Sequence, residues 1–124
     1  MATKERDLFE GVNMVEDPGN PTDLEKKHIP VITAPDEVKA GEPFEVTVEV
    51  GKLKEHPDDP DHLINFITLY AGHVYLARLD LVPGRAKPTM KTTVVLDKEL
   101  GPLRAFEYCN IHGTWESRKE IAVK

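Results

Sequence analysis

From Ile29 onwards, the chain consists of short apolar or alternating runs that Pro, Gly and Asp residues separate. Phe44–Val50 alternates apolar and polar side chains, as a strand with one buried face does. Turn signals recur about every 8–12 residues, a spacing typical of an antiparallel sandwich. The pattern predicts an all-β chain, a seven-stranded immunoglobulin-like antiparallel β-sandwich. Its expected strands are Val31–Thr33, Phe44–Val50, Ile64–Tyr70, His73–Leu81, Thr89–Leu96, Leu103–Tyr108 and Lys119–Val123.

The first 27 residues are polar and carry turn signals around Pro18 and Pro21. We expect an extended N-terminal arm with one short helical turn around Arg6–Gly11, followed by a lysine-containing loop. Residues 28–124 then form the sandwich, and the 124 residues make one domain that can bury a core. The N-terminus lacks an apolar signal core, and no stretch reaches the roughly 20 apolar residues of a membrane helix. These features predict a cytoplasmic protein that does not insert into a membrane.

Charge and cysteine content narrow the function. The net charge of the chain is -6, which argues against nucleic acid or an anionic membrane as the main partner. The single cysteine, Cys109, cannot form an intramolecular disulfide. In a cytosolic-looking chain, such a residue is core filler, a nucleophile or a metal ligand.

His112 lies three residues after Cys109 and directly before Gly113. Side chains three apart on a straight strand point to opposite faces, so these two converge only if the chain turns after Tyr108. Asn110 and Gly113 favour such a turn. Cys109 and His112 are therefore candidate metal ligands, with a buried apolar role for Cys109 as the alternative.

Three more histidines lie at or near the ends of predicted strands: His28, His56 and His62. The loops of a sandwich cluster at its two ends, so these imidazoles can converge at one rim. Pro57 and Pro60 restrict the loop from His56 to His62, which suits two imidazoles held at a fixed separation. The alternatives are a solvated acidic loop and, for His28, a linker residue.

Four imidazoles and one thiolate exceed the four ligands of a closed structural zinc site. Four nitrogens in a plane and a soft axial sulfur leave one position open on a redox metal such as iron. The thiolate donates electron density to the metal, which helps an oxygen-derived ligand react on the opposite side. The residue types therefore indicate a redox centre, provided that the five side chains meet.

The ligand-bearing segments resemble those of the superoxide reductases, specifically the one-iron neelaredoxin type. The matching segments, in the order of that family and at about its spacing, are Lys27–Ile32, Val50–Lys52, His56–His62 and Tyr108–Glu116. The resemblance extends from roughly Glu25 to the C-terminus. Ala71–Leu96 is more similar to the shorter version of this domain in the two-iron desulfoferrodoxins, whose additional N-terminal cysteines this chain lacks.

That resemblance implies an immunoglobulin-like β-sandwich with a mononuclear non-haem iron (Fe) that reduces superoxide to hydrogen peroxide. It implies four equatorial histidine ligands and one axial cysteine: His28, His56, His62, His112 and Cys109. It also implies that Lys27 attracts superoxide and helps a proton reach the reacting oxygen through water. An external donor, typically rubredoxin, re-reduces the iron. Members of the family often form tetramers, so we expect a homotetramer.

The chain departs from the family beside His28. The family commonly has glutamate, lysine and histidine in succession, with the glutamate as a sixth ligand of resting ferric iron. Here Lys26 lies where the glutamate is expected, and Glu25 is displaced by one residue. Either a bulge in the loop lets Glu25 reach the iron, or water or hydroxide takes the sixth position. We favour water or hydroxide, because Pro30 restricts how far the backbone beyond His28 can adjust. Lys26 and Lys27 predict a positive window for an anion on an acidic surface.

Two other functions fit parts of the sequence. A cupredoxin-like copper electron-transfer protein also uses a β-sandwich with His and Cys ligands. It needs an axial methionine soon after the histidine, and none of Met1, Met14 and Met90 lies there. It also has no use for His56 and His62 together. The second alternative is a non-enzymatic immunoglobulin-like binding module with incidental histidines. The sequence also leaves open whether some dismutation accompanies reduction.

Overall fold

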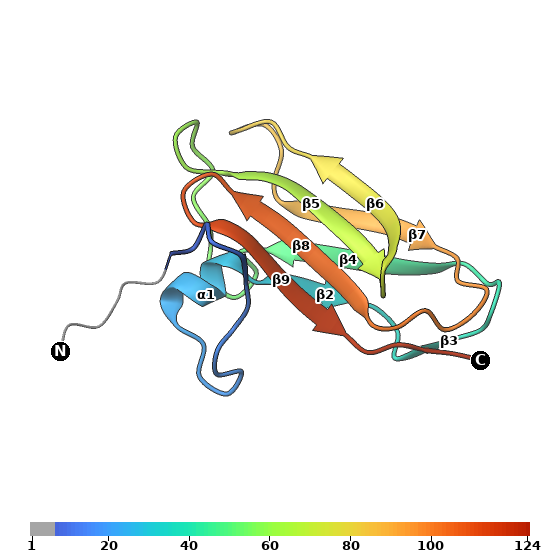
Figure 1. Ribbon diagram of the computed structural model, residues 1–124. Helices are drawn as coiled ribbons and strands as arrows, with labels where there is room; N and C mark the ends of the chain where they lie inside the picture. The colour runs from blue at the N-terminus through green and yellow to red at the C-terminus, as the bar shows by residue number, and fades with distance from the viewer. Residues whose placement is uncertain (1–6) are drawn as a thin grey trace.

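The computed structural model describes residues 7–124 and is built mainly of β-strands (Figure 1). Its elements are β1 (Val12–Asn13), α1 (Asp23–His28), β2 (Pro30–Thr33), β3 (Glu37–Val38), β4 (Phe44–Val50), β5 (Ile64–Ala71), β6 (Val74–Asp80), β7 (Thr89–Val94), β8 (Leu103–Cys109), β9 (Gly113–Lys119) and β10 (Ala122–Val123). A five-stranded sheet in the order β1-β9-β8-β5-β6 packs against a three-stranded sheet in the order β2-β4-β7. The short strands β10 and β3 form a separate parallel pair. Within these residues, no helix has the length and apolar character needed to cross a membrane.

The core lies between the two sheets and follows the alternation of the strands. On β4, Val46, Val48 and Val50 are buried, whereas the residues between them are partly exposed. They belong to one apolar cluster with Ile67 and Leu69 of β5, in the other sheet. Burying a side chain of this size contributes about 1.5–3 kcal/mol. The β-sandwich that the alternation predicted is therefore confirmed.

The last part of the sandwich differs from the prediction. The strand expected at Lys119–Val123 is replaced by β9, which begins at Gly113, and by the two-residue β10. The sequence of β9 is mostly polar, and its position follows from antiparallel pairing with β8 across the turn after Cys109. Within residues 7–124 there are ten strands rather than seven, because β1, β3 and β10 are two-residue strands that lack a visible pattern.

The N-terminal arm has more structure than the sequence predicted. Residues 8–11 form a turn and a bend rather than a helical turn, and Arg6 lies outside the described residues. β1 pairs in parallel with β9. The Asn13 Nδ2 donates to the carbonyl oxygens of Leu8 and Thr114, at 2.8 and 2.9 Å. The arm therefore packs along the edge of the larger sheet before the chain enters α1.

The two ends of the sandwich carry different connections (Figure 1). One end holds α1, the β4–β5 loop at residues 51–63 and the β8–β9 turn at residues 110–112. The other end holds the turns at Gly41, Gly72 and Gly101, each with positive φ, together with the C-terminus. The single cysteine and every histidine except His73 belong to the first end. We call these the ligand end and the glycine end.

Candidate metal centre

Helix α1 brings His28 to the ligand end. It begins with a capping box, in which the Thr22 side chain accepts from the Glu25 N–H at 3.2 Å and the Glu25 carboxylate accepts from the Thr22 N–H at 2.8 Å. It ends at His28 because the following residue precedes Pro30 and is extended. The His28 ring is fully buried, and its Nδ1 donates to the Leu24 carbonyl oxygen at 2.7 Å. The Nε2 therefore keeps its lone pair for a metal.

The loop after β4 carries His56 to the same end. It leaves the strand through Gly51, whose φ of +84° is left-handed, and a Cβ there would lie 3.0 Å from the His56 backbone nitrogen. The His56 ring is buried, and its Nδ1 donates to the Pro57 carbonyl oxygen at 2.6 Å. Its Nε2 lies 3.2 Å from the His28 Nε2 and 3.4 Å from the Cys109 Sγ.

A tight turn between β8 and β9 brings Cys109 and His112 together. Cys109 ends β8, is fully buried and pairs with Gly113, the first residue of β9. Gly113 has a φ of +79°, and a Cβ there would lie 2.2 Å from the Leu8 carbonyl oxygen, so glycine is required where the turn meets the arm. The His112 Nδ1 lies 3.9 Å from the Cys109 Sγ. The turn expected after Tyr108 is present, one residue later.

β9 holds both neighbouring segments in place. The Trp115 ring is fully buried and stacks on the His28 imidazole, with centroids 5.1 Å apart and planes 23° apart. Its Nε1 donates to the His112 carbonyl oxygen at 3.0 Å. On the same face of β9, the Ser117 hydroxyl donates to the carbonyl oxygen of Pro30, two residues after His28. One strand thus fixes the ligands that come from α1 and from the turn.

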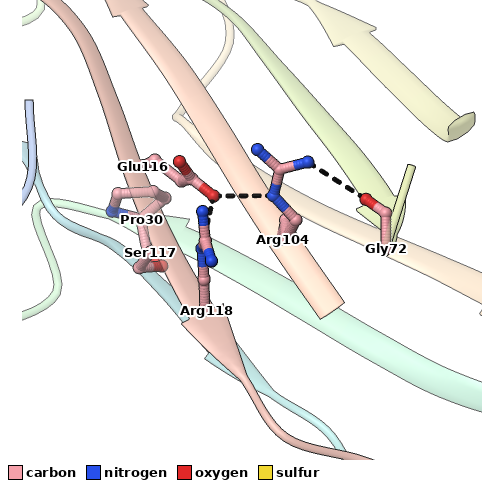
Figure 2. Close-up of polar contacts among 6 residues, drawn as sticks. All are labelled: Pro30, Gly72, Arg104, Glu116, Ser117 and Arg118. Atoms are coloured by element: carbon pink, nitrogen blue, oxygen red, sulfur yellow. Dashed lines mark hydrogen bonds and ion pairs between the residues drawn. The ribbon is translucent and has the colours of Figure 1, made fainter. Parts of the chain in front are cut away.

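The opposite face of β9 is fixed by the ion-pair network shown in Figure 2. The Glu116 Oε2 accepts from the Arg104 Nε at 2.8 Å and from the Arg118 Nε at 2.9 Å. Arg104 also donates through Nη1 to the Gly72 carbonyl oxygen at 3.1 Å. Burial raises the pKa of Glu116, but the hydrogen bonds from both arginines outweigh it and hold the pKa below its ordinary value. Glu116 therefore stays ionised and ties β9 to β8.

The four imidazoles form a closed circuit of ring contacts. The centroid distances are 4.7 Å for His28–His56, 4.7 Å for His56–His62, 5.0 Å for His62–His112 and 4.8 Å for His112–His28. Ligand atoms of His28, His62, His112 and Cys109 all lie within 4.8 Å of one another. The His56 Nε2 joins them through its contacts with His28 and Cys109. The structure thus brings all five expected ligand residues to one place.

The cluster has the properties of a metal site. The His62 Nε2 is buried and has no hydrogen-bond partner among residues 7–124. A buried nitrogen left unpaired costs about 1–3 kcal/mol, which coordination to a metal removes. Burial lowers the pKa of His28 to about 4 and also lowers the pKa of His56 and His112, so these rings are neutral and ready to coordinate at neutral pH. Burial raises the pKa of the Cys109 thiol, so thiolate formation needs the metal.

Lys27 lies beside this cluster on α1. It is half-buried and lines a shallow pocket together with His56 and residues 57–59. The pKa of His56 and that of His112 are lowered mainly by burial and then by neighbouring imidazoles, and the positive charge of Lys27 is a further cause for both. The field of this lysine therefore reaches the ligand cluster.

Glu25, the other candidate catalytic residue, is buried and faces the arm. One carboxylate oxygen accepts from the Thr22 N–H at 2.8 Å, and the other accepts from the Glu16 N–H at 3.1 Å. These contacts hold the Glu25 carboxylate at the N-terminal end of α1, whereas His28 is the last residue of the helix. Both oxygens are thus bound to backbone groups of the arm and the helix start.

Sequence reasoning missed Glu107, two residues before Cys109. It is fully buried on the core face of β8, and neither carboxylate oxygen has a hydrogen-bond partner among residues 7–124. Burial raises the pKa of this carboxyl well above its ordinary range and so favours its neutral, protonated form. The available signal was its position: Leu103, Ala105 and Cys109 alternate on one face of the strand, and Glu107 is the acidic member of that face.

A β-sandwich with four imidazoles and a thiol converging at one end defines a metal-binding protein with a mononuclear redox site. The desulfoferrodoxin family model matches residues 20–118. Similar proteins include the superoxide reductase of Pyrococcus abyssi, 34% identical over 105 residues that cover 77% of this chain and 88% of the relative. The neelaredoxin of Megalodesulfovibrio gigas is 32% identical over 116 residues, which cover 80% of this chain and 89% of that protein.

A solved structure agrees with this match. The superoxide reductase (neelaredoxin) from Ignicoccus hospitalis superposes with a TM-score of 0.72 and 45% sequence identity, covering 78% of this chain and 81% of that one. Residues 20–118, which the family model matches, contain every residue of the ligand cluster. The chain therefore belongs to the desulfoferrodoxin family.

Proposed function

We propose that this protein is a superoxide reductase, with a mononuclear iron held by four histidines and one cysteine: His28, His56, His62, His112 and Cys109. The observation that carries the proposal is the closed circuit of imidazoles with the Cys109 Sγ beside it. A zinc site closed by four ligands has no use for a fifth. A three-ligand copper site leaves His56 and His62 without a role.

The reaction adds one electron and two protons to superoxide and yields hydrogen peroxide. Iron, when bound, supplies the electron and an open position, and the Cys109 thiolate enriches the metal in electron density. The residues around the cluster hold two of the rings in one geometry: Leu24 and Trp115 fix His28 by hydrogen bonding and stacking, and Pro57 fixes His56 by hydrogen bonding. Such outer contacts set the tautomer and direction of each coordinating ring.

Lys27 supplies the local positive charge that an anionic substrate needs. The chain as a whole carries a charge of -6, so its long-range field repels superoxide. Lys27 lines the same shallow pocket as His56, and its positive charge contributes to the lowered pKa of His56 after burial and the neighbouring imidazoles. It attracts the anion there and helps to deliver a proton through water. Lys26, the neighbouring residue on α1, adds to the same positive window.

Glu25 has a positioning role in this proposal. Both of its carboxylate oxygens are bound to backbone N–H groups, and coordination to iron would break these bonds and the capping box. These bonds support a role for Glu25 in holding the arm and the start of α1, and Glu25 would not be among the residues that hold the iron. Three further proposals rest on the family resemblance: an external donor of rubredoxin type, a homotetrameric assembly and a cytoplasmic location.

Metal analysis combined with superoxide consumption tests this function. The purified protein should contain one iron per chain and consume superoxide rapidly when an electron donor is present. Cys109→Ser should remove the thiolate-to-iron absorption and most of the activity. Copper in place of iron, or a Cys109→Ser variant that reduces superoxide as fast as the natural protein, would refute the proposal.

A further inference from the structure

Asn110 bonds to the chain on both sides of His62. Its side-chain Oδ1 accepts from the Leu63 N–H at 2.9 Å, and its Nδ2 donates to the Asp61 carbonyl oxygen at 2.9 Å. Its own backbone N–H donates to the Leu63 carbonyl oxygen at 3.3 Å. Asn110 directly follows Cys109. One residue therefore connects the cysteine turn to the backbone that carries His62.

This connection lies where the regular strand pairing is interrupted. Ile64 pairs with Cys109, but the register between β5 and β8 shifts between Ile64 and Phe66. Ile64 is the first residue of β5, so Asp61, His62 and Leu63 lie outside the ladder. Among residues 7–124, the His62 backbone bonds only to Asp59, through two hydrogen bonds at 3.0 and 3.1 Å. The hydrogen bonds of Asn110 are what join this local loop to β8.

His62 also differs from His28 and His56 in how its ring is held. The rings of His28 and His56 each donate through Nδ1 to a carbonyl oxygen of their own segment. The His62 Nε2 is buried without a hydrogen-bond partner among residues 7–124. No hydrogen bond from the His62 ring to its own segment is present among residues 7–124, so the direction of this ring depends more on where its backbone is placed.

We propose that Asn110 is a positioning residue that sets the spacing between His62 and the Cys109 Sγ before a metal binds. The inference rests on the metal site of the proposed function, not on its substrate. A planar amide suits the task because it offers a donor and an acceptor together, which Leu63 and Asp61 both require. An aspartate of the same shape keeps the acceptor but loses the donor.

Binding of Co²⁺ to the metal-free protein tests this role without measuring catalysis. The absorption of the thiolate-to-cobalt transition reports both affinity and geometry at Cys109. We expect Asn110→Asp to weaken Co²⁺ binding about 10- to 100-fold, the usual effect of losing a residue that orients a ligand, and to shift this transition. Unchanged affinity and absorption would overturn the proposal.

A double-mutant cycle shows whether Asn110 acts through His62. His62→Gln should weaken Co²⁺ binding, and adding Asn110→Asp to it should cause little further loss. If the two losses multiply independently, Asn110 does not act through His62 and the proposal is wrong. Asn110→Ser, which retains a short hydroxyl, is measured in the same way if the aspartate variant does not fold.

A remote core variant separates positioning from general loss of stability. Val94→Ala shortens a buried residue of β7 in the apolar core, and should lower the unfolding temperature while leaving Co²⁺ affinity unchanged. An equal loss of affinity in Val94→Ala would contradict the specific role of Asn110. Failure of superoxide reduction in a protein that binds Co²⁺ normally would instead count against the proposed function alone.

Discussion

The two ends of the sandwich share the same strands but are stabilised by different interactions. At the ligand end, side chains from three separate segments meet, and the His62 Nε2 remains without a hydrogen bond among residues 7–124. At the glycine end, backbone groups meet instead: the Gly72 N–H donates to the Pro102 carbonyl oxygen at 2.8 Å. The comparison indicates that the glycine end mainly stabilises the fold, whereas the ligand end holds the metal-binding side chains. Mutations at the glycine end should therefore change stability, and mutations at the ligand end should change metal binding or activity.

The largest effect on stability is expected at the glycine end. Gly72 has a φ of +57°, and a Cβ there would lie 1.9 Å from the Leu100 carbonyl oxygen. An alanine held in the left-handed backbone conformation lowers the free energy of unfolding by about 1–2 kcal/mol. The clash of its Cβ with the backbone adds about 1–3 kcal/mol. Denaturant unfolding of metal-free Gly72→Ala should show this loss, with Co²⁺ affinity unchanged. A weakened metal affinity would mean that the two ends are coupled.

Acid should destabilise the metal-free protein through the ligand end. Burial lowers the pKa of His28 from 6.5 to about 4, so between these values the unfolded chain binds more protons than the folded one. Stability therefore falls as pH falls through this interval, by about 3 kcal/mol at about 1.4 kcal/mol for each pKa unit. Unfolding measured across the interval should show a shallower decrease in His28→Gln. An equal decrease in both proteins would assign the acid sensitivity elsewhere.

Lys27→Ala should slow superoxide reduction about tenfold, the lower part of the range for electrostatic steering. Removing the positive charge beside His56 should also weaken the dependence of the rate on ionic strength. Lys39→Ala removes an exposed lysine at the glycine end and serves as the matched control, with an unchanged rate. Equal rates and salt dependence in Lys27→Ala and the natural protein would exclude steering by this residue.

Glu25→Gln should have the smallest effect, about 1 kcal/mol of stability, because an amide replaces a charged cap at the start of α1. The thiolate-to-iron absorption of the oxidised protein should stay the same, since both carboxylate oxygens bind backbone N–H groups. Thermal unfolding and the oxidised spectrum check the two parts separately. A large spectral shift would show that Glu25 reaches the iron after all.

The sequence predicted the regular parts of the fold well. Alternation in Phe44–Val50 identified a strand with one buried face, and the structure confirms it. It did not predict β9, because β9 is mostly polar and its place depends on pairing with β8. It also missed α1, although Thr22 and Glu25 have the spacing of a capping box, because six residues are too few for a clear helical period.

The residue types of the candidate site could be read from the sequence, but not the contacts that orient them. The spacing of Cys109 and His112 indicated a turn, and the turn is present. No local pattern could reveal that Asn110 spans 47 residues to bind Leu63, because that contact depends on the packing of two distant segments. Glu107 was missed for a different reason: it shares a strand face with Leu103, Ala105 and Cys109, but an acidic residue is not expected on a buried face.

The yield of hydrogen peroxide per superoxide consumed tests the central claim most directly. With an external electron donor in excess, a superoxide reductase forms one peroxide for each superoxide and releases no dioxygen. We predict this yield for the natural protein and its loss in Cys109→Ser. One peroxide for every two superoxides, with dioxygen released, would show dismutation and contradict the account.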